Sequence, residues 1–466
     1  MDGQSRGVQN SDELGGFSAP VWTPRNYQLI GIDHLLNTES GLCFLPGLGK
    51  TSVTLQSFMT LRSMGLAKRM LVLAPLMVCR AVWRQEAKKW DNFRELNVGL
   101  AHGRDRLKIL LDRSFDVVVL NYEGLQWAHT HLASGFEVLV CDELTCLKHT
   151  NSKRFKYIKP QLSNFKFRWG LTGTLASNSI MDVFGQTYVL DMGQRLGRYI
   201  TSFRAQYFDP DYSGFGFTPK PGAVDEILSK VKDLYLFVRL EDALDLPDFI
   251  DDIRIDEFDR GLYARYKFFE DEFLLNFEDD TVITAVSAGA LSLKLRQFVS
   301  GAMYDAERNV VHVHDAKLEM LDELLDEMQG EPLMVAYQFD HERARILARH
   351  PDVLALSGGM STKDVDSVIA KWNTGKVPML LVQPQAASKG LNLQVGGHHI
   401  CWFSLTFSLE DFDQLNARLR RQGQTKTVVR HFLAFKDTVD ERVSKALARK
   451  DATQNHVNAA LTRKIL

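Results

Sequence analysis

Three short groups of residues carry the side chains that could do chemistry in this chain. The first is the segment Pro46–Thr51, which follows the apolar run Gly41–Leu45 and precedes a helix-like stretch. Glycines in such a segment let backbone N–H groups converge on phosphate oxygens, and the start of a helix adds a positive dipole end. Lys50 supplies a mobile positive charge, and the hydroxyl of Thr51 can ligate Mg²⁺. The group predicts a phosphate-binding loop, although the usual pattern has a glycine where this chain has Phe44.

The second group is a pair of adjacent carboxylates, Asp142 and Glu143, at the end of the apolar run that begins at Val138. At the carboxyl end of a buried strand, one carboxylate can bind Mg²⁺ through water while the other orients or deprotonates an attacking water. A solvated strand end is the alternative for this pair taken alone. A phosphate-binding loop after one strand and two carboxylates after another together predict a nucleoside triphosphatase.

The third group is Gln414–Gln424, in which Arg418 and Arg421 are three residues apart and therefore share one helical face. Planar guanidinium groups on such a face can reach the γ-phosphate of a nucleotide and neutralise charge in the transition state. A solvated basic helix is the alternative for this segment taken alone.

Apolar runs that alternate with helix-like stretches surround these groups in two blocks. Continuous apolar runs are typical of parallel strands that are covered on both faces. In the first block the runs are 41–45, 70–74, 116–120, 137–141 and 167–171, and in the second 333–337, 353–356, 379–382, 399–403 and 428–432. Amphipathic stretches such as Thr51–Met64 and Val78–Asp91 have the length of crossover helices. The pattern predicts two α/β lobes.

The composition is that of a globular protein with room for more than one core. The chain has 466 residues, of which 45% are hydrophobic and 24% charged, and this excludes a mainly disordered or collagen-like chain. A net charge of -2 argues on its face against nucleic acid. However, residues Glu241–Asp280 contain 15 acidic and 4 basic side chains, whereas Gln414–Leu466 contains 12 basic and 4 acidic ones. The small total therefore does not exclude a DNA partner.

The five cysteines are scattered, and four of them lie in or beside apolar runs, as expected for buried thiols. Cys141 and Cys146 lack a second ligand pair at the spacing of a zinc site, so no metal cluster is predicted. The polar start of the chain does not resemble an export signal, and no apolar run approaches the ~18 residues of a membrane span. We expect a cytoplasmic protein with no membrane partner.

Taken in order, these motifs resemble the Swi/Snf branch of superfamily-two helicases, ATPases related to chromatin remodellers. Phages and bacteria encode many short forms, and the resemblance covers residues 22–433. The segment Gly170–Thr174 is close to the family's Gly-Leu-Thr-Gly-Thr motif, and Gln414–Gln424 aligns without gaps on its arginine motif. The segment Val238–Pro247 resembles the stretch that joins the two lobes in this branch.

The resemblance implies an α/β fold of two tandem RecA-like parallel-sheet lobes with a helical insertion between them. It predicts a flexible N-terminal tail at 1–20, an ATP-binding lobe one at 21–190 and a helical insertion with an acidic linker at 191–294. Lobe two with a basic C-terminal helix would follow at 295–466. We expect that helix to be solvated, with DNA or a partner as the alternative.

The resemblance also assigns tasks to individual residues and implies ATP and Mg²⁺ as cofactors. Catalysis is expected of Glu143, Arg418 and Arg421, and metal binding of Thr51 and Asp142. The residues expected to bind ATP are Gln28, Gly47, Gly49, Lys50, Thr51 and Asp142. Those expected to contact DNA or couple it to the ATP site are Trp83, Tyr122, Thr172, Gly173, Thr174, Gln338, Gly390 and Asn392.

Two positions depart from the family pattern. Thr145 replaces the histidine that usually follows the carboxylate pair, a position that bears on the coupling between nucleotide state and lobe contacts. Ala387 and Ser388 replace a pair of glycines in lobe two. The residues expected to serve Mg²⁺ and water are nevertheless both present.

The resemblance implies a DNA-stimulated ATPase that translocates on duplex DNA, whereas spacing alone indicates only a triphosphatase with an arginine finger. Two alternatives stay open. One is a strand-separating DNA helicase, and the other is an ATP-dependent scaffold that clamps DNA with little turnover. ATP turnover with and without duplex DNA separates the scaffold from the enzymes. The sequence names no protein partner.

Overall fold

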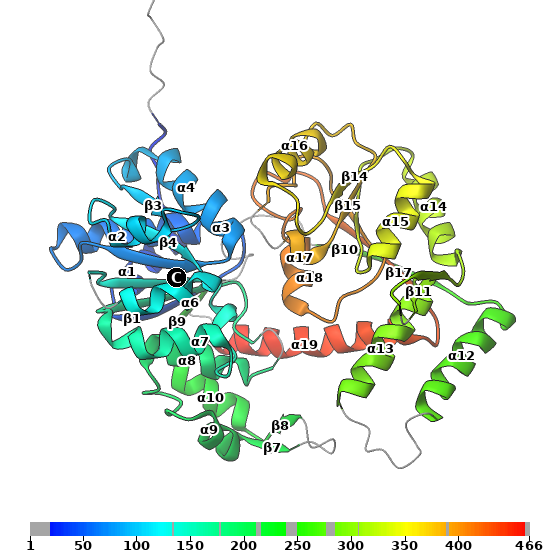
Figure 1. Cartoon of the computed structure of the whole chain (residues 1–466), viewed down its shortest axis with the longest axis horizontal. Helices are drawn as coiled ribbons and strands as arrows, with labels where there is room; N and C mark the ends of the chain where they lie inside the picture. Colours follow the sequence, from blue (N-terminus) through cyan, green and yellow to red (C-terminus); the bar gives the residue numbers. More distant parts are fainter. Residues whose placement is uncertain are drawn as a thin grey trace, which may run out of the picture.

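Two parallel sheets, each flanked by helices, form two lobes that lie side by side (Figure 1). This computed structural model describes residues 19–132, 135–176, 179–210, 216–238, 249–275, 285–305, 307–387 and 391–461. Among those residues, no helix is both long and apolar enough to cross a membrane. The prediction of a two-lobed α/β fold is confirmed.

Lobe one contains a seven-stranded sheet in the order β3-β4-β2-β5-β6-β1-β9, with every neighbouring pair parallel. Its strands are β1 (Glu39–Phe44), β2 (Met70–Ala74), β3 (Val98–Leu100), β4 (Val117–Asn121), β5 (Val138–Asp142), β6 (Phe167–Thr172) and β9 (Tyr235–Val238). The central strands are buried on both faces, which explains their continuous apolar sequences. Sheets of this kind place the carboxyl ends of their strands along one edge.

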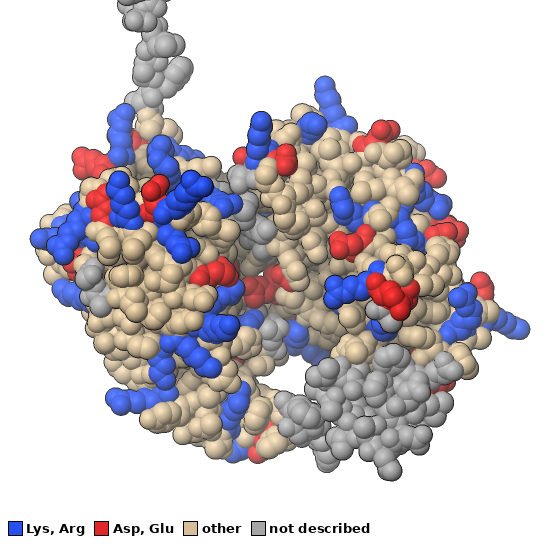
Figure 2. All heavy atoms as spheres, viewed as in Figure 1, with Lys and Arg blue, Asp and Glu red and all other residues tan. Residues whose placement is uncertain are grey.

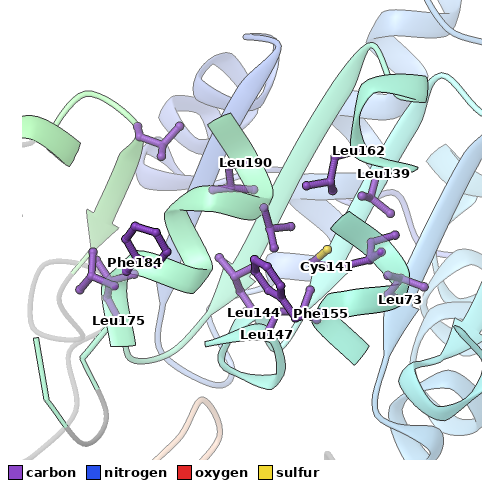
Figure 3. Packing of buried hydrophobic residues seen from close by; sticks show 14 of the residues in the cluster. Leu73, Leu139, Cys141, Leu144, Leu147, Phe155, Leu162, Leu175, Phe184 and Leu190 are labelled. Atoms are coloured by element: carbon purple, nitrogen blue, oxygen red, sulfur yellow. The ribbon is translucent and has the colours of Figure 1, made fainter. Parts of the chain in front are cut away.

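Helices cover both faces of this sheet and create two hydrophobic cores. They are α1 (Asn26–Leu35), α2 (Lys50–Ser63), α3 (Leu76–Ala81), α4 (Trp83–Lys89), α5 (Arg106–Leu111), α6 (Leu125–Ala128), α7 (Lys153–Ile158), α8 (Asp182–Asp191), α9 (Ile200–Tyr207) and α10 (Ala223–Val231). Figure 3 shows one core, in which Cys141 of β5 and Phe155 of α7 lie among Leu144 and Leu147. These two leucines follow the predicted carboxylate pair and anchor its turn.

Lobe two contains a six-stranded parallel sheet in the order β10-β17-β16-β13-β15-β14. Its strands are β10 (Ile250–Asp256), β13 (Leu333–Ala336), β14 (Leu354–Leu356), β15 (Met379–Val382), β16 (His399–Trp402) and β17 (Val429–Phe435). Its helices are α12 (Arg260–Leu275), α13 (Ala285–Val299), α14 (Ala316–Met328), α15 (Asp340–Arg349), α16 (Thr362–Trp372), α17 (Pro384–Ala387) and α18 (Leu409–Asn416). Two short hairpins, β7 (Phe208–Pro210) with β8 (Phe217–Pro219) and β11 (Ala302–Tyr304) with β12 (Val310–His312), lie outside the two sheets.

The segment expected as one insertion, 191–294, contributes a strand to each lobe. Strand β9 pairs with β1, and Gly41 lies opposite Tyr235. Strand β10 pairs with β17 along its whole length. The expected boundaries therefore need correction, because lobe one extends to residue 238 and the sheet of lobe two begins at residue 250. The rest of the expected joining segment, 239–247, lies outside the described residues.

The last helix, α19 (Val439–Leu461), extends from lobe two to lobe one (Figure 1). Val443 and Leu447 lie in the core of lobe two, whereas Val457 lies in the core of lobe one. The side-chain oxygen of Gln454 accepts a hydrogen bond from the backbone N–H of Ala176 at 3.0 Å. Helix α19, which was expected to be solvated, therefore packs against both lobes.

Candidate functional site

The segment Pro46–Thr51 connects β1 to α2 at the carboxyl edge of the lobe-one sheet. Gly47 and Gly49 have φ angles of 92° and 78°, a backbone conformation that favours glycine. A Cβ atom on Gly49 would lie 2.5 Å from Nε2 of Gln28. That Nε2 donates a hydrogen bond to the carbonyl of Leu48 at 3.2 Å. The predicted Gln28 therefore lies against the phosphate-binding loop and needs glycine there.

Lys50 begins α2, and its Nζ donates a hydrogen bond to the carbonyl of Phe44 at 2.6 Å. Burial lowers the pKa of the Lys50 ammonium, while the charges of Glu143 and Asp142 raise it. The lysine at the start of α2 and the two carboxylates at the end of β5 therefore influence one another electrostatically. A phosphate group bound in this loop would be a further anionic partner for the Lys50 ammonium.

The carboxylate pair occupies the end of β5. Asp142 is the last residue of the strand, and Trp83 Nε1 donates a hydrogen bond to its Oδ2 at 2.9 Å. Glu143 has a φ of 61°, which is uncommon outside glycine. The buried side chains of Leu144 and Leu147 hold this turn in place. Burial raises the pKa of Glu143 to about 7, and the charge of Glu410 adds to that effect.

The residues predicted to bind metal fit Mg²⁺ when it is carried by a nucleotide. Asp142 and Thr51 offer a carboxylate and a hydroxyl, which are the oxygen ligands that Mg²⁺ prefers. Throughout the described ranges, no group of three or more His, Cys, Asp or Glu side chains could hold a metal ion. This donor set suits an ion that keeps waters and phosphate oxygens as its other ligands.

The two arginines of lobe two reach the site of lobe one. Arg421 lies against the phosphate-binding loop, since its Cβ is 3.6 Å from the position of a Cβ on Gly47. Its Nη1 donates to the carbonyl of Leu391 at 3.3 Å. Arg418 is 5% exposed, and burial with the charge of Arg421 lowers its pKa to about 10, while Glu143 raises it. The structure thus brings residues from distant parts of the sequence together across the two lobes.

Thr145 and three residues that the sequence analysis did not assign, Glu410, Gln414 and Lys148, complete this cluster. Thr145 Oγ1 lies 3.0 Å from Oε1 of Glu143 and 3.1 Å from Oε1 of Glu410. Gln414 Nε2 donates to Oε2 of Glu143 at 3.4 Å, and Lys148 Nζ lies 3.5 Å from Oε2 of Glu410. Gln414 opens the arginine motif, which was a usable signal. Glu410 lies 265 residues from Thr145 and gave no such signal.

The loop after β6 adjoins the phosphate-binding loop. A Cβ atom on Gly173 would lie 3.5 Å from Cδ of Pro46. Thr172 Oγ1 donates to the carbonyl of Thr174 at 2.7 Å and accepts from its N–H at 3.1 Å. The Thr172 hydroxyl is therefore engaged within its own turn, and Gly173 of that turn lies beside Pro46 of the predicted phosphate-binding loop.

Trp83 and Tyr122 lie inside lobe one. Trp83 is fully buried and contacts Asp142, while the hydroxyl of Tyr122 donates to the carbonyl of Asp142 at 3.0 Å. Both side chains therefore support the carboxylate pair from behind. A contact with DNA from these two segments would have to come from exposed neighbours such as Arg84.

The coupling residues of lobe two are described only in part. Gln338 follows β13, and its backbone N–H donates to Oε2 of Glu342 at 2.7 Å. Asn392 is exposed and adjoins Leu391, whose carbonyl contacts Arg421. The predicted Gly390, like Ser388, lies outside the described residues.

Comparison with known proteins agrees with this arrangement of lobes and motifs. Residues 27–194 match the SNF2-related domain, and residues 316–423 match the helicase conserved C-terminal domain. Protein p41 of Acyrthosiphon pisum secondary endosymbiont phage 1 is 32% identical over 95% of this chain and 100% of its own length. An uncharacterized ATP-dependent helicase of Mycoplasma pneumoniae is 24% identical over 91% of this chain. The chain spans only 41% of that helicase.

Among solved structures, the chain is similar to the SWI2/SNF2 ATPase core of Sulfolobus solfataricus in complex with dsDNA. The two are 22% identical with a TM-score of 0.45, over 95% of this chain and 94% of the other. The two matched domains and the full-length relative agree with the motifs found in the sequence. The chain belongs to the Snf2-related family of superfamily-two helicase-like ATPases, which are ATP-hydrolysing enzymes.

Proposed function

We propose that this protein is a DNA-stimulated ATPase that couples ATP hydrolysis to translocation along duplex DNA. The observation that carries the proposal is the position of Arg421, from lobe two, whose Cβ lies 3.6 Å from where a Cβ atom on Gly47 of the phosphate-binding loop would be. A nucleotide in this loop would touch both lobes. Its hydrolysis and release would therefore change what binds the lobes to each other, and the lobes could open and close once per cycle.

In this proposal lobe one binds the nucleotide. The backbone N–H groups of the loop and the Lys50 ammonium contact the phosphates, and Gln28 offers an acceptor and donors to the adenine edge. Thr51 and Asp142 bind Mg²⁺, which neutralises phosphate charge when bound. Binding a nucleotide and its metal ion needs side chains that are held in place. All four of these residues lie near the carboxyl edge of the lobe-one sheet.

The chemical step draws on both lobes. Glu143 orients the attacking water and accepts its proton, for which a pKa near the working pH is favourable. Arg418 and Arg421 stabilise the negative charge that develops on the transferred phosphoryl group. Because the two arginines belong to lobe two, hydrolysis should be fast only when the lobes are together.

A DNA partner is supported by the family and by charge. Residues 21–238 contain 27 Lys and Arg against 19 Asp and Glu, so lobe one carries a net positive charge although the whole chain does not. Figure 2 displays Lys and Arg side chains over the face of lobe one that carries α4 and α7. Such side chains bind DNA mainly through its phosphates, without regard to sequence. The turn that contains Gly173 would connect this face of lobe one with the ATP site.

The test is ATP turnover measured without nucleic acid, with single-stranded DNA and with duplex DNA. We expect duplex DNA to give the largest rise in turnover, and the rise to shrink as salt is added. Displacement of a third strand from a triplex then reports translocation, and a forked duplex reports strand separation. An ATP turnover rate that is the same with and without duplex DNA would contradict the proposed stimulation. A triplex whose third strand is not displaced would contradict translocation.

A further inference from the structure

We infer that Thr145 and Glu410 are positioning residues that orient Glu143 for hydrolysis only when lobe two lies against lobe one. The inference rests on the proposed ATP hydrolysis and concerns the contact that transmits lobe closure to the carboxylate. Neither residue reaches the phosphate-binding loop through any hydrogen bond or ion pair that the described residues form with each other. Their effect must therefore pass through Glu143.

The shared hydroxyl of Thr145 is the first step. It lies 3.0 Å from Oε1 of Glu143 and 3.1 Å from Oε1 of Glu410, and the residue is only 4% exposed. A hydroxyl carries one hydrogen, so two carboxylates from different lobes depend on a single donor. Such charge-assisted hydrogen bonds are strong where water is excluded. The direction of the Thr145 hydroxyl is thus sensitive to the position of Glu410.

Glu410 is held from two sides. It lies in the first turn of α18, where the helix dipole favours a carboxylate, and Ser408 caps that helix by accepting from the N–H of Asp411. Lys148 of lobe one lies 3.5 Å from its Oε2 and 3.9 Å from Oδ2 of Asp182. The lysine compensates the charge of Glu410 in the interface. The approach of α18 to lobe one therefore has a defined, paired geometry.

Both carboxylate oxygens of Glu143 depend on α18. Oε1 contacts Thr145, which in turn contacts Glu410, and Oε2 accepts from Gln414 Nε2 at 3.4 Å. Glu410 and Gln414 are four residues apart and share one face of the helix. The backbone of Glu143 is fixed by the buried turn that follows it, so these contacts set only the direction of its side chain. Withdrawal of α18 would free Oε2 from Gln414 and would remove Glu410 as the second acceptor of the Thr145 hydroxyl, so the surroundings of both oxygens would change together.

The test compares steady-state kcat and KM for ATP in four variants, with saturating duplex DNA. Thr145→Val removes the hydroxyl at nearly constant shape, Thr145→Ser retains it, and Glu410→Ala removes the second acceptor. We expect kcat to fall about 10- to 100-fold in Thr145→Val and Glu410→Ala, with KM for ATP within about twofold of wild type. Thr145→Ser should restore most of the turnover. Glu323→Ala removes an exposed lobe-two glutamate and should change nothing.

The double variant Thr145→Val/Glu410→Ala separates a positioning pair from two unrelated losses. Residues that act as one unit are not additive, so its kcat should lie within about twofold of the lower single variant. Thermal unfolding of each variant provides the folding control. Unchanged kcat in both single variants, or a change confined to KM, overturns this inference while wild-type turnover stands. A wild-type protein without ATP turnover overturns the proposed function and this inference together.

Discussion

The two lobes present their site residues in different ways. In lobe one, the phosphate-binding loop, the carboxylate pair and the Gly173 turn follow β1, β5 and β6, which are neighbours in one buried sheet. In lobe two, Arg418 and Arg421 come after α18. The Arg421 side chain lies against the phosphate-binding loop, and Arg418 interacts electrostatically with Glu143. In the proposed cycle, lobe one would be a fixed binding site, whereas the arginines of lobe two could be withdrawn. This difference would let a nucleotide control the contact between the lobes.

Among changes in lobe one, the largest effect is expected from Lys50→Ala. Loss of the Lys50 ammonium would leave the negative charge of the ATP phosphates without this positive partner. Removal of a single hydrogen-bond donor that stabilises a transition state typically lowers turnover about 100- to 1,000-fold. We expect ATP hydrolysis to be lost while duplex DNA binding, measured by fluorescence anisotropy, stays close to wild type. Retained ATP hydrolysis in this variant would contradict the assignment of Pro46–Thr51 as the phosphate-binding loop.

A smaller effect is expected from Gly185→Ala, which tests the rigidity of lobe one. A Cβ atom there would lie 2.3 Å from the backbone oxygen of Lys148, next to the turn of Leu147. Overpacking of this kind lowers the free energy of unfolding by about 1–3 kcal/mol. Urea denaturation measures the change.

The matched control is Gly289→Ala in α13 of lobe two, where nothing lies within 4 Å of the added atom. Alanine favours a helix over glycine, so this change should raise the free energy of unfolding by about 0.5–1 kcal/mol. If both substitutions lowered the free energy of unfolding equally, the close packing around Gly185 would not be the cause of the effect.

A destabilisation slightly smaller than that of Gly185→Ala is expected from Gln454→Ala in α19. Its side chain is 3% exposed and accepts the N–H of Ala176, so truncation leaves a buried donor without its partner. The free energy of unfolding should fall by about 1–2 kcal/mol. Asn455→Ala on the same helix is exposed and should stay within about 0.5 kcal/mol of wild type. If Gln454→Ala and this control had the same free energy of unfolding, the hydrogen bond from Ala176 to Gln454 would not stabilise the protein.

Continuous apolar runs made most of the fold predictable. Strands β2 and β15 have the predicted bounds, because runs buried on both faces leave little choice of structure. Strand β10 was missed, since its charged residues and exposed Ile253 and Ile255 are tolerated only at the edge of a sheet. Strand β9 is apolar, but it pairs with β1 nearly 200 residues away, and pairing at that distance has no local signal.

The candidate site was predictable where a motif follows a strand. Gly49, Lys50 and Asp142 could be placed because loops at the carboxyl edge of parallel strands must meet. The partners of these residues could not be placed, because the contacts of Trp83 with Asp142 and of Glu410 with Thr145 arise only from tertiary packing.

The central claim, that lobe two completes the ATP site of lobe one, is tested most directly by Arg421→Ala. ATP affinity and ATP turnover should be measured on one preparation of this variant, with thermal unfolding as the folding control. We predict ATP affinity within about threefold of wild type and turnover about 1,000-fold lower, since an arginine finger acts mainly in the transition state. Turnover within about threefold of wild type would contradict the account.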